Sequence, residues 1–414
     1  MLPHRTPFRS RPAPQRRAAP AGSENWPEPW VQLKYFSFHP NIFPNMIASA
    51  KARAGDVVTV MDKDGRRFGH GFYNPAARAS LRVFSHSVEP LAEDHFEQSI
   101  AQALSLRLDT LRLPETTDAF RVIHSDGDRI PGLMVDKLGD VLSIEISTFG
   151  VWKRIEQWIP LLHARLGTKQ AFVQFDQRAA AAENMSERDI ADVCGRLSDA
   201  PESTRIKENE TRFHVNFAAG HKTGFFCDQR DNRAQFGKWT RGQRVLDLCC
   251  YTGGFSVAAK MNDAAEVTGV DLDEKSIEVA KKNANLNQQR IEFVHADAFV
   301  WMRQMVRNGE MWDAVVLDPP KLILSREGWE EGKAKYHDLN KLAMSLVKPG
   351  GLLLTCSCSG LMPQFDFEEI VIGIAHRGGR KLQLLDRSGA AADHPVMSNC
   401  PESLYLKTMW TRVW

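Results

Sequence analysis

Two adjacent glycines, Gly253 and Gly254, stand between an apolar run at residues 245–248 and a helix-like run at residues 255–260. The apolar run has the length of one buried strand, and glycines after a strand let backbone N–H groups approach a ligand closely. Asp271 ends the next apolar run. An acid about 20 residues past such a turn grips a ribose diol in doubly wound sheets. This spacing indicates a site for a nucleotide-like cofactor, although glycine pairs are also common in ordinary α/β loops.

Three further predicted strands also end in polar residues. Asp297 follows a run at residues 291–294, Asp318 follows one at residues 314–317, and a run at residues 352–354 leads into Thr355-Cys-Ser-Cys-Ser359. Open α/β sheets bind ligands at the carboxyl ends of their strands. Five polar strand ends in sequence order therefore predict an α/β fold with a doubly wound, Rossmann-like sheet.

The composition of the 414 residues limits the class of protein. Hydrophobic residues make up 43% and charged residues 25%, as in an ordinary soluble globular protein, and the length predicts two or three domains. No apolar run reaches the roughly 18 residues of a membrane span, so we expect no membrane segment. The net charge of +2 means that nucleic-acid binding must depend on local patches.

The seven cysteines are odd in number, and most lie beside predicted core strands. This arrangement favours a reducing, cytoplasmic compartment over a disulfide framework. Cys356 and Cys358 lack a second Cys or His pair at the spacing of a zinc site, so we expect no metal site.

The first two segments differ in composition. Residues 1–27 hold five arginines, several prolines and one acid. This predicts a disordered basic tail, because the prolines oppose the amphipathic helix of a transit peptide. Residues 28–105 are predicted to form one domain that is β up to about residue 88, with a hairpin around Asp64-Gly65, and a helix is predicted at residues 96–113, across the end of that domain. Four basic residues in predicted loops of this segment could contact RNA, but composition alone favours a solvated rim; they are Lys51, Arg53, Arg66 and Arg67.

The remaining chain divides near residue 204. Residues 106–204 mix predicted strands and helices, including a helix at residues 151–166. Residues 205–414 hold the predicted cofactor sheet, preceded by a polar segment at residues 220–230 that lies before a helix start. That placement favours a lid over the cofactor, and a surface turn with a capped helix is the alternative.

Several segments resemble the bacterial 23S ribosomal RNA cytosine-C5 methyltransferase family that carries an N-terminal PUA domain. They are Gly220–Arg230, Tyr251–Phe255, Asp318-Pro-Pro-Lys321, Ser357–Met362, Ala391–Val396 and Leu404–Lys407. The resemblance implies a PUA-like RNA-binding barrel in residues 28–105 and a linking α/β domain in residues 106–204. It implies a class I S-adenosylmethionine-dependent methyltransferase domain in residues 205–414. The implied partner is RNA, 23S rRNA in particular, and a homodimer is left open.

The resemblance also implies S-adenosyl-L-methionine as the cofactor. Asp271 would hold its ribose hydroxyls, Asp297 would hold its adenine amino group, and Asp318 would lie between the methyl donor and the target base. The residues implied around the methionine portion are Tyr251, Thr252, Gly253, Lys222, Gln229 and Arg230.

Methylation at carbon 5 of cytosine needs a nucleophile, because this carbon is poorly reactive. A thiolate that adds to carbon 6 makes an enamine, whose carbon 5 can attack the sulfonium methyl group. Cys358 and Asp318 are placed to be that thiolate and the group that binds or protonates N3. A base must then remove the carbon 5 proton, and the target base must leave its stack to reach the pocket.

We predict that Cys358, not Cys356, is the nucleophile. Residues i and i+2 of a strand share a face, so alternation cannot distinguish the two thiols. Cys356 is nearer the apolar run and should be buried, whereas Ser359-Gly360 lets the backbone turn away and expose Cys358. Most free cysteines are small buried apolar residues, and the surrounding motifs favour the nucleophile here.

Two alternatives remain open. Many RNA cytosine-C5 enzymes carry a second cysteine right after the proline of the fourth strand end, where this chain has Lys321, so a two-cysteine mechanism is not expected. Methylation of a base nitrogen is one alternative, although enzymes that methylate amines usually have an aromatic residue there. A non-catalytic RNA-binding protein with a decayed cofactor fold is the other, and Asp271 and the glycine pair oppose it.

Overall fold

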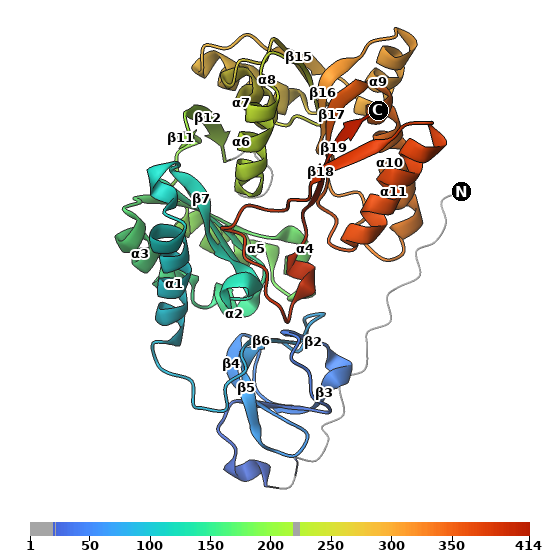
Figure 1. The fold of residues 1–414 in the computed structure, drawn as a ribbon. Coiled ribbons are helices and arrows are strands. Elements are labelled where there is room, and N and C mark those ends of the chain that lie inside the picture. The colour runs from blue at the N-terminus through green and yellow to red at the C-terminus, as the bar shows by residue number, and fades with distance from the viewer. Residues whose placement is uncertain (1–19, 21, 218–223) are drawn as a thin grey trace, which may run out of the picture. The chain divides into compact units, whose positions relative to one another are not determined.

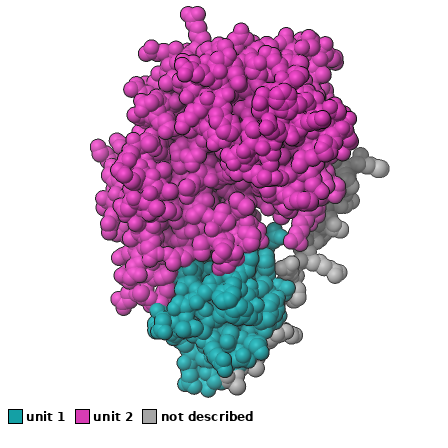
Figure 2. All heavy atoms as spheres, viewed as in Figure 1, with its two compact units in different colours: residues 1–90 teal, residues 91–414 magenta. Residues whose placement is uncertain are grey.

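The computed structural model describes the chain except residues 1–19, 21 and 218–223. It divides into two compact units, Met1–Pro90 and Leu91–Trp414 (Figure 2). Most of the predicted basic tail, and Lys222, lie outside the described residues. Among the helices that are described, none has the length and apolar character needed to cross a membrane.

The first unit is built on a six-stranded sheet with the strand order β2-β6-β5-β4-β1-β3. β4 and β5 pair antiparallel, with Val57 opposite Phe72, which confirms the predicted hairpin. Gly65 has a φ of 78° in the connecting turn, a conformation that favours glycine. The strands are β1 (Trp30–Leu33), β2 (Asn41–Ile42), β3 (Ile47–Lys51), β4 (Asp56–Met61), β5 (Arg67–Tyr73) and β6 (Leu81–Ser85).

The second unit begins before the helix that the sequence predicts at residues 96–113, across the end of the first predicted domain. α1 (His95–Ser105) packs Phe96 against Trp158 of α3 (Ile155–Leu166), with ring centroids 5.1 Å apart. Arg107, in the π-helical turn η3 (Leu106–Thr110), is fully buried and donates to the backbone carbonyl oxygen of Arg121. The division therefore falls at Pro90 and not at residue 105, because the helix buries its apolar side on the central strands.

The central part of the second unit is a four-stranded sheet with the order β10-β9-β8-β7, followed by the hairpin of β11 and β12. The predicted helix at residues 151–166 is interrupted after Trp152 and resumes at Ile155. The strands are β7 (Ala119–His124), β8 (Leu133–Leu138), β9 (Val141–Ile146), β10 (Gln170–Phe175), β11 (Ser203–Glu208) and β12 (Thr211–Asn216). The remaining helices are α2 (Phe149–Trp152), α4 (Gln177–Ala182) and α5 (Glu187–Leu197).

The last part of the chain forms a seven-stranded sheet with the order β15-β14-β13-β16-β17-β19-β18 (Figure 1). β13 to β17 are parallel, and β19 returns antiparallel between β17 and β18. The strands are β13 (Arg244–Leu248), β14 (Glu266–Asp271), β15 (Glu292–His295), β16 (Trp312–Leu317), β17 (Val347–Ser357), β18 (Leu382–Asp386) and β19 (Lys407–Val413). The strand order reverses between β13 and β16, where such sheets bind their ligands.

Helices cover both faces of this sheet, as the predicted doubly wound fold requires. Alternate strand residues face opposite sides, so Leu246 and Leu353 join one core with α9, α10 and α11. Val245 and Cys356 join the other core with α6 and α7. The helices are α6 (Arg230–Trp239), α7 (Gly254–Met261), α8 (Glu274–Leu286), α9 (Ala298–Arg307), α10 (Trp329–Ser345) and α11 (Gln364–Arg377).

Candidate active site

The turn between β13 and α7 is tied to the end of β14. The backbone N–H of Tyr251 donates to Asp271 Oδ2 at 2.8 Å, and the carbonyl oxygen of Thr252 accepts from Asn283 Nδ2 at 2.9 Å. Gly253 caps α7 with a φ of 79°, and a Cβ there would lie 3.0 Å from the ring of Phe293. The structure therefore brings together the predicted glycine turn and the predicted acid, and it adds Asn283, which has no sequence motif around it.

Four carboxyl groups converge on this carboxyl edge of the sheet. Burial and the charges of Asp271, Asp318, Asp247 and Asp297 all raise the pKa of the Cys249 thiol above its ordinary value. Burial also raises the pKa of Asp247 and of Asp318, each to about 7. Clustered carboxyl groups of this kind favour a ligand that carries positive charge.

Gln229 and Asp318 are in direct contact. Gln229 Nε2 donates to Asp318 Oδ2 at 2.9 Å, and it lies 3.7 Å from the sulfur of Cys356. Asn232 orients the amide by donating from Nδ2 to Gln229 Oε1 at 2.6 Å. Gln229, which the resemblance implies near the methionine portion of a cofactor, is thus fixed beside Asp318, which the resemblance implies next to the target base.

The two thiols at the end of β17 differ in burial, as predicted. Cys356 is fully buried, and burial raises its pKa well above the ordinary value, with Asp318 adding to the effect. Cys358 follows the last residue of β17 and is half-buried, with its sulfur 3.8 Å from the carbonyl oxygen of Pro319. A buried neutral thiol is a poor nucleophile, so the geometry favours Cys358 over Cys356 for covalent chemistry.

The Arg230 side chain is held in a buried ion pair with Asp393. Its guanidinium donates to both carboxylate oxygens of Asp393, at 2.9 and 3.0 Å, and both residues are buried. Burial lowers the pKa of Arg230, but the hydrogen bonds and charge of Asp393 outweigh it and raise that pKa above its ordinary value. Asp393 also accepts from the backbone N–H of Arg121, and its carbonyl oxygen accepts from Arg107 Nη2 at 2.6 Å. Arg230 therefore joins α6 to the central sheet through the loop before β19.

The sequence indicates the Ala391–Val396 segment only as part of a resemblance, and it does not reveal this role of Asp393.

Asp297, which the resemblance implies at the adenine amino group, lies at the start of α9. Its side chain caps that helix by accepting from the backbone N–H of Val300 at 2.9 Å. A cap of this kind occupies one oxygen and leaves the other end of the carboxylate for a second donor.

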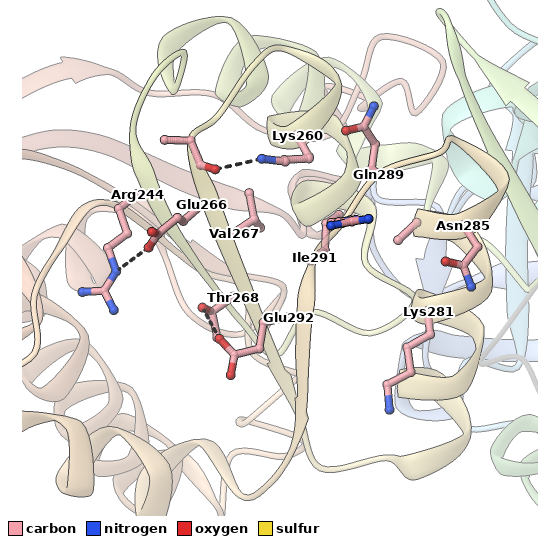
Figure 3. A pocket seen from close by; sticks show the side chains of 13 residues that line it. Arg244, Lys260, Glu266, Val267, Thr268, Lys281, Asn285, Gln289, Ile291 and Glu292 are labelled. Atoms are coloured by element: carbon pink, nitrogen blue, oxygen red, sulfur yellow. Dashed lines mark hydrogen bonds and ion pairs between the residues drawn. The ribbon is translucent and has the colours of Figure 1, made fainter.

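A separate hollow of about 680 Å³ opens at the opposite edge of the sheet, where β13, β14 and β15 begin (Figure 3). Some of its polar groups contact one another: Arg244 lies 3.3 Å from Glu266, and Thr268 donates to Glu292 at 3.2 Å. Because open α/β sheets bind ligands at the carboxyl ends of their strands, this hollow is not the candidate site.

Comparison with known proteins agrees with this geometry. Residues 162–398 match the S-adenosylmethionine-dependent methyltransferase family, and residues 32–86 match the PUA-like domain family. The chain is 35% identical over 384 residues to the ribosomal RNA large subunit methyltransferase I of Tolumonas auensis, covering 90% of this chain and 95% of that protein. It is 33% identical over 381 residues to the protein of the same name from Pseudoalteromonas atlantica, covering 91% and 95%.

The fold is also similar to that of SMU.776, a chain described as a methyltransferase and solved in complex with SAH. The TM-score is 0.77 at 20% identity, and the match covers 92% of this chain and 99% of that one. Together with the family matches, this confirms the predicted fold class, a PUA-like domain followed by a class I methyltransferase fold.

Proposed function

This chain belongs to the family of ribosomal RNA large subunit methyltransferases I, and on that premise we propose that it forms 5-methylcytosine in large-subunit ribosomal RNA. The methyl donor is S-adenosylmethionine. The observation that carries the proposal is the half-buried thiol of Cys358, which lies at the end of β17 beside the loop that holds Asp318.

The carboxyl edge around β13 and β14 fits S-adenosylmethionine. The donor carries a positively charged sulfonium and an ammonium group, and the carboxyl groups that act on Cys249, Asp271 and Asp297 among them, provide the opposite charge. We assign the ribose hydroxyls to Asp271 and the adenine amino group to Asp297. Tyr251, Thr252 and Gly253 form the turn that would face the methionine portion, with Gln229 beside it.

In the proposed reaction, the Cys358 thiolate forms a bond from sulfur to carbon 6 of cytosine. The electron pair of the C5–C6 double bond then makes carbon 5 nucleophilic, and carbon 5 takes the methyl group while the pair of the breaking S–CH₃ bond stays on the cofactor sulfur. A base removes the carbon 5 proton, the C5–C6 double bond reforms, and the thiolate leaves. The methyl transfer needs no oxidant or reductant.

Asp318 supplies the hydrogen bond that the addition step requires. Its pKa of about 7 leaves a large fraction protonated at neutral pH, and a protonated carboxyl can donate to N3 as negative charge develops on the ring. Gln229 holds one of the two carboxyl oxygens and so orients the other. Asp318→Asn would remove the acidic proton that is donated to N3 while keeping the shape of the side chain.

The test uses RNA that carries 5-fluorocytosine at the target. Fluorine cannot be removed as a proton, so the enzyme should stay covalently joined to the RNA after methyl transfer. We expect a denaturation-resistant complex with the wild-type enzyme and with Cys356→Ala, and none with Cys358→Ala.

A crosslink that maps to Cys356, or a Cys358→Ala enzyme that still turns over, would overturn the assignment of the nucleophile. A methylated product without 5-methylcytosine would instead indicate methylation of a base nitrogen. Absence of any methylated RNA, with no heat on titration of S-adenosylmethionine, would indicate a non-catalytic RNA-binding protein.

A further inference from the structure

Lys407 is a buried lysine at the start of β19, next to the proposed nucleophile. Only 2% of its surface is exposed, and its ammonium donates to the carbonyl oxygens of Ser359 at 2.6 Å and Tyr405 at 2.7 Å. In the antiparallel pairing of β17 and β19, Lys407 lies opposite Ser357. The ammonium therefore contacts the residue directly after Cys358, and its strand position is opposite the residue directly before it.

The surroundings of Lys407 provide no ordinary counter-ion. Within the described part of the chain, its ammonium forms no ion pair with a carboxylate. The groups that act on its charge are the Cys358 thiol and the ammonium of Lys321, which is exposed on the loop after β16. Tyr336 of α10, hydrogen-bonded to Ser357 and Ser359, also interacts electrostatically with Cys358.

This burial disfavours the charged form of the lysine. Burial lowers the pKa of Lys407 to about 8, the Cys358 thiol opposes that shift, and Lys321 adds to it. Two backbone carbonyl oxygens could be satisfied by a neutral amide, so the hydrogen bonds alone do not account for a buried charge. Among the residues that the structure describes, the one acidic group that acts on the ammonium is the thiol that must ionise for the proposed reaction.

We propose that Lys407 is a positioning residue for Cys358: it fixes the turn after β17 and its buried positive charge stabilises the Cys358 thiolate. This inference rests on the proposed function, in which Cys358 is the nucleophile. Electrostatic coupling is reciprocal, so a thiolate that favours the charged lysine is favoured by it to the same extent. The charge of Asp318 disfavours a thiolate at this edge, since it raises the pKa of the Cys356 thiol. The positive charge of Lys407 acts in the opposite direction on Cys358.

The experiment measures the pH dependence of alkylation of Cys358 by iodoacetamide in the full-length enzyme without RNA. Mass spectrometry of the Cys358 peptide separates its rate from the rates of the other six cysteines. Lys407→Met keeps an unbranched side chain, one atom shorter, without the charge, and Lys407→Gln supplies an uncharged amide donor for the carbonyl oxygens. For both variants we expect the midpoint of alkylation to rise by about one pH unit, and the rate at neutral pH to fall by up to tenfold.

Lys407→Arg keeps the charge, so its midpoint should lie closer to that of the wild type than the midpoints of the Met and Gln variants do. A purely structural role of Lys407 would not predict this difference. Lys321→Met is the matched control, because its exposed charge is screened by solvent and should shift the midpoint much less. Coinciding midpoints for the wild type, Lys407→Met and Lys407→Gln would overturn the inference. If 5-fluorocytosine RNA still traps Cys358 in that case, the proposed function stands and only the role of Lys407 fails. If the wild type forms no trapped complex, the proposed function fails whatever the titration shows.

Discussion

Replacing Asp318 by Asn should stabilise the cofactor-free protein at alkaline pH while removing most of its activity. Asn keeps the shape and the oxygen that accepts from Gln229 Nε2, so the contact at 2.9 Å can persist. It removes the carboxyl that burial and the charges of Asp228 and Asp247 hold in an unfavourable ionised state. The loss of a general acid costs about 10²–10⁴ in rate.

The size and sign of the effect follow from the pKa of Asp318. Folding raises it from 3.8 to about 7, so the folded protein keeps a proton that the unfolded chain has lost. This penalty is absent below pH 3.8, grows as the pH rises toward 7, and is constant above that value. A shift of about 3 units corresponds to about 4 kcal/mol at most. Because Asp318 is only half-buried and water can relax around it, we expect about 2 kcal/mol.

Urea unfolding of the cofactor-free wild type and of Asp318→Asn at acid and alkaline pH measures this difference. The two proteins should have similar free energies of unfolding at about pH 4, and the variant should be more stable by about 2 kcal/mol at about pH 8. Asp313→Asn, on the strand β16 that ends directly before Asp318, is the matched control. Hydrogen bonds from Lys348 and Arg244 outweigh burial and lower the pKa of Asp313, so this change should destabilise the protein at about pH 8.

A difference between wild type and Asp318→Asn that does not change with pH would refute the reasoning. So would a variant that is less stable than the wild type at alkaline pH. Either result would mean that the Asp318 carboxyl is well solvated or paired in the folded protein, and that its pKa is close to the ordinary value.

Three further outcomes follow from the site and the fold. Asp271→Ala should weaken S-adenosylmethionine binding by roughly 1.5–3 kcal/mol in calorimetry, as for the loss of charge-assisted hydrogen bonds, and unchanged affinity in a folded variant would contradict the assigned ribose contact. Asp393→Asn should lower the free energy of unfolding by about 3–5 kcal/mol, because it removes the buried counter-charge of Arg230 and leaves only the exposed Asp231 as its partner; a loss near zero in chemical denaturation would show that water reaches this pair. A protein that begins at Leu91 should keep its affinity for the cofactor but lose most of its affinity for RNA, and the RNA binding of the full chain should fall steeply with salt. Equal RNA affinity of the two proteins in a filter-binding assay would assign another purpose to the first unit.

The sequence alone determined the parallel strands and the polar residues at their ends. Local patterns specify these features, because an apolar run, a glycine turn and an acid lie within a few residues of each other. The strand that ends in Asp271 and the helix after Gly253 therefore lie where the sequence predicts them. The difference in burial between Cys356 and Cys358 could also be predicted, since it depends on distance from the apolar run along a single strand.

The tertiary structure decided which distant groups meet. β19 returns antiparallel between β17 and β18, and this return brings Lys407 to the residues that flank Cys358. The same part of the chain carries Asp393, which pairs with Arg230 from 163 residues away. No local periodicity encodes such pairs, because they arise from the order in which strands join the sheet. α1 shows the same limit: its pattern predicts a helix, but only packing decides that this helix belongs with the central strands.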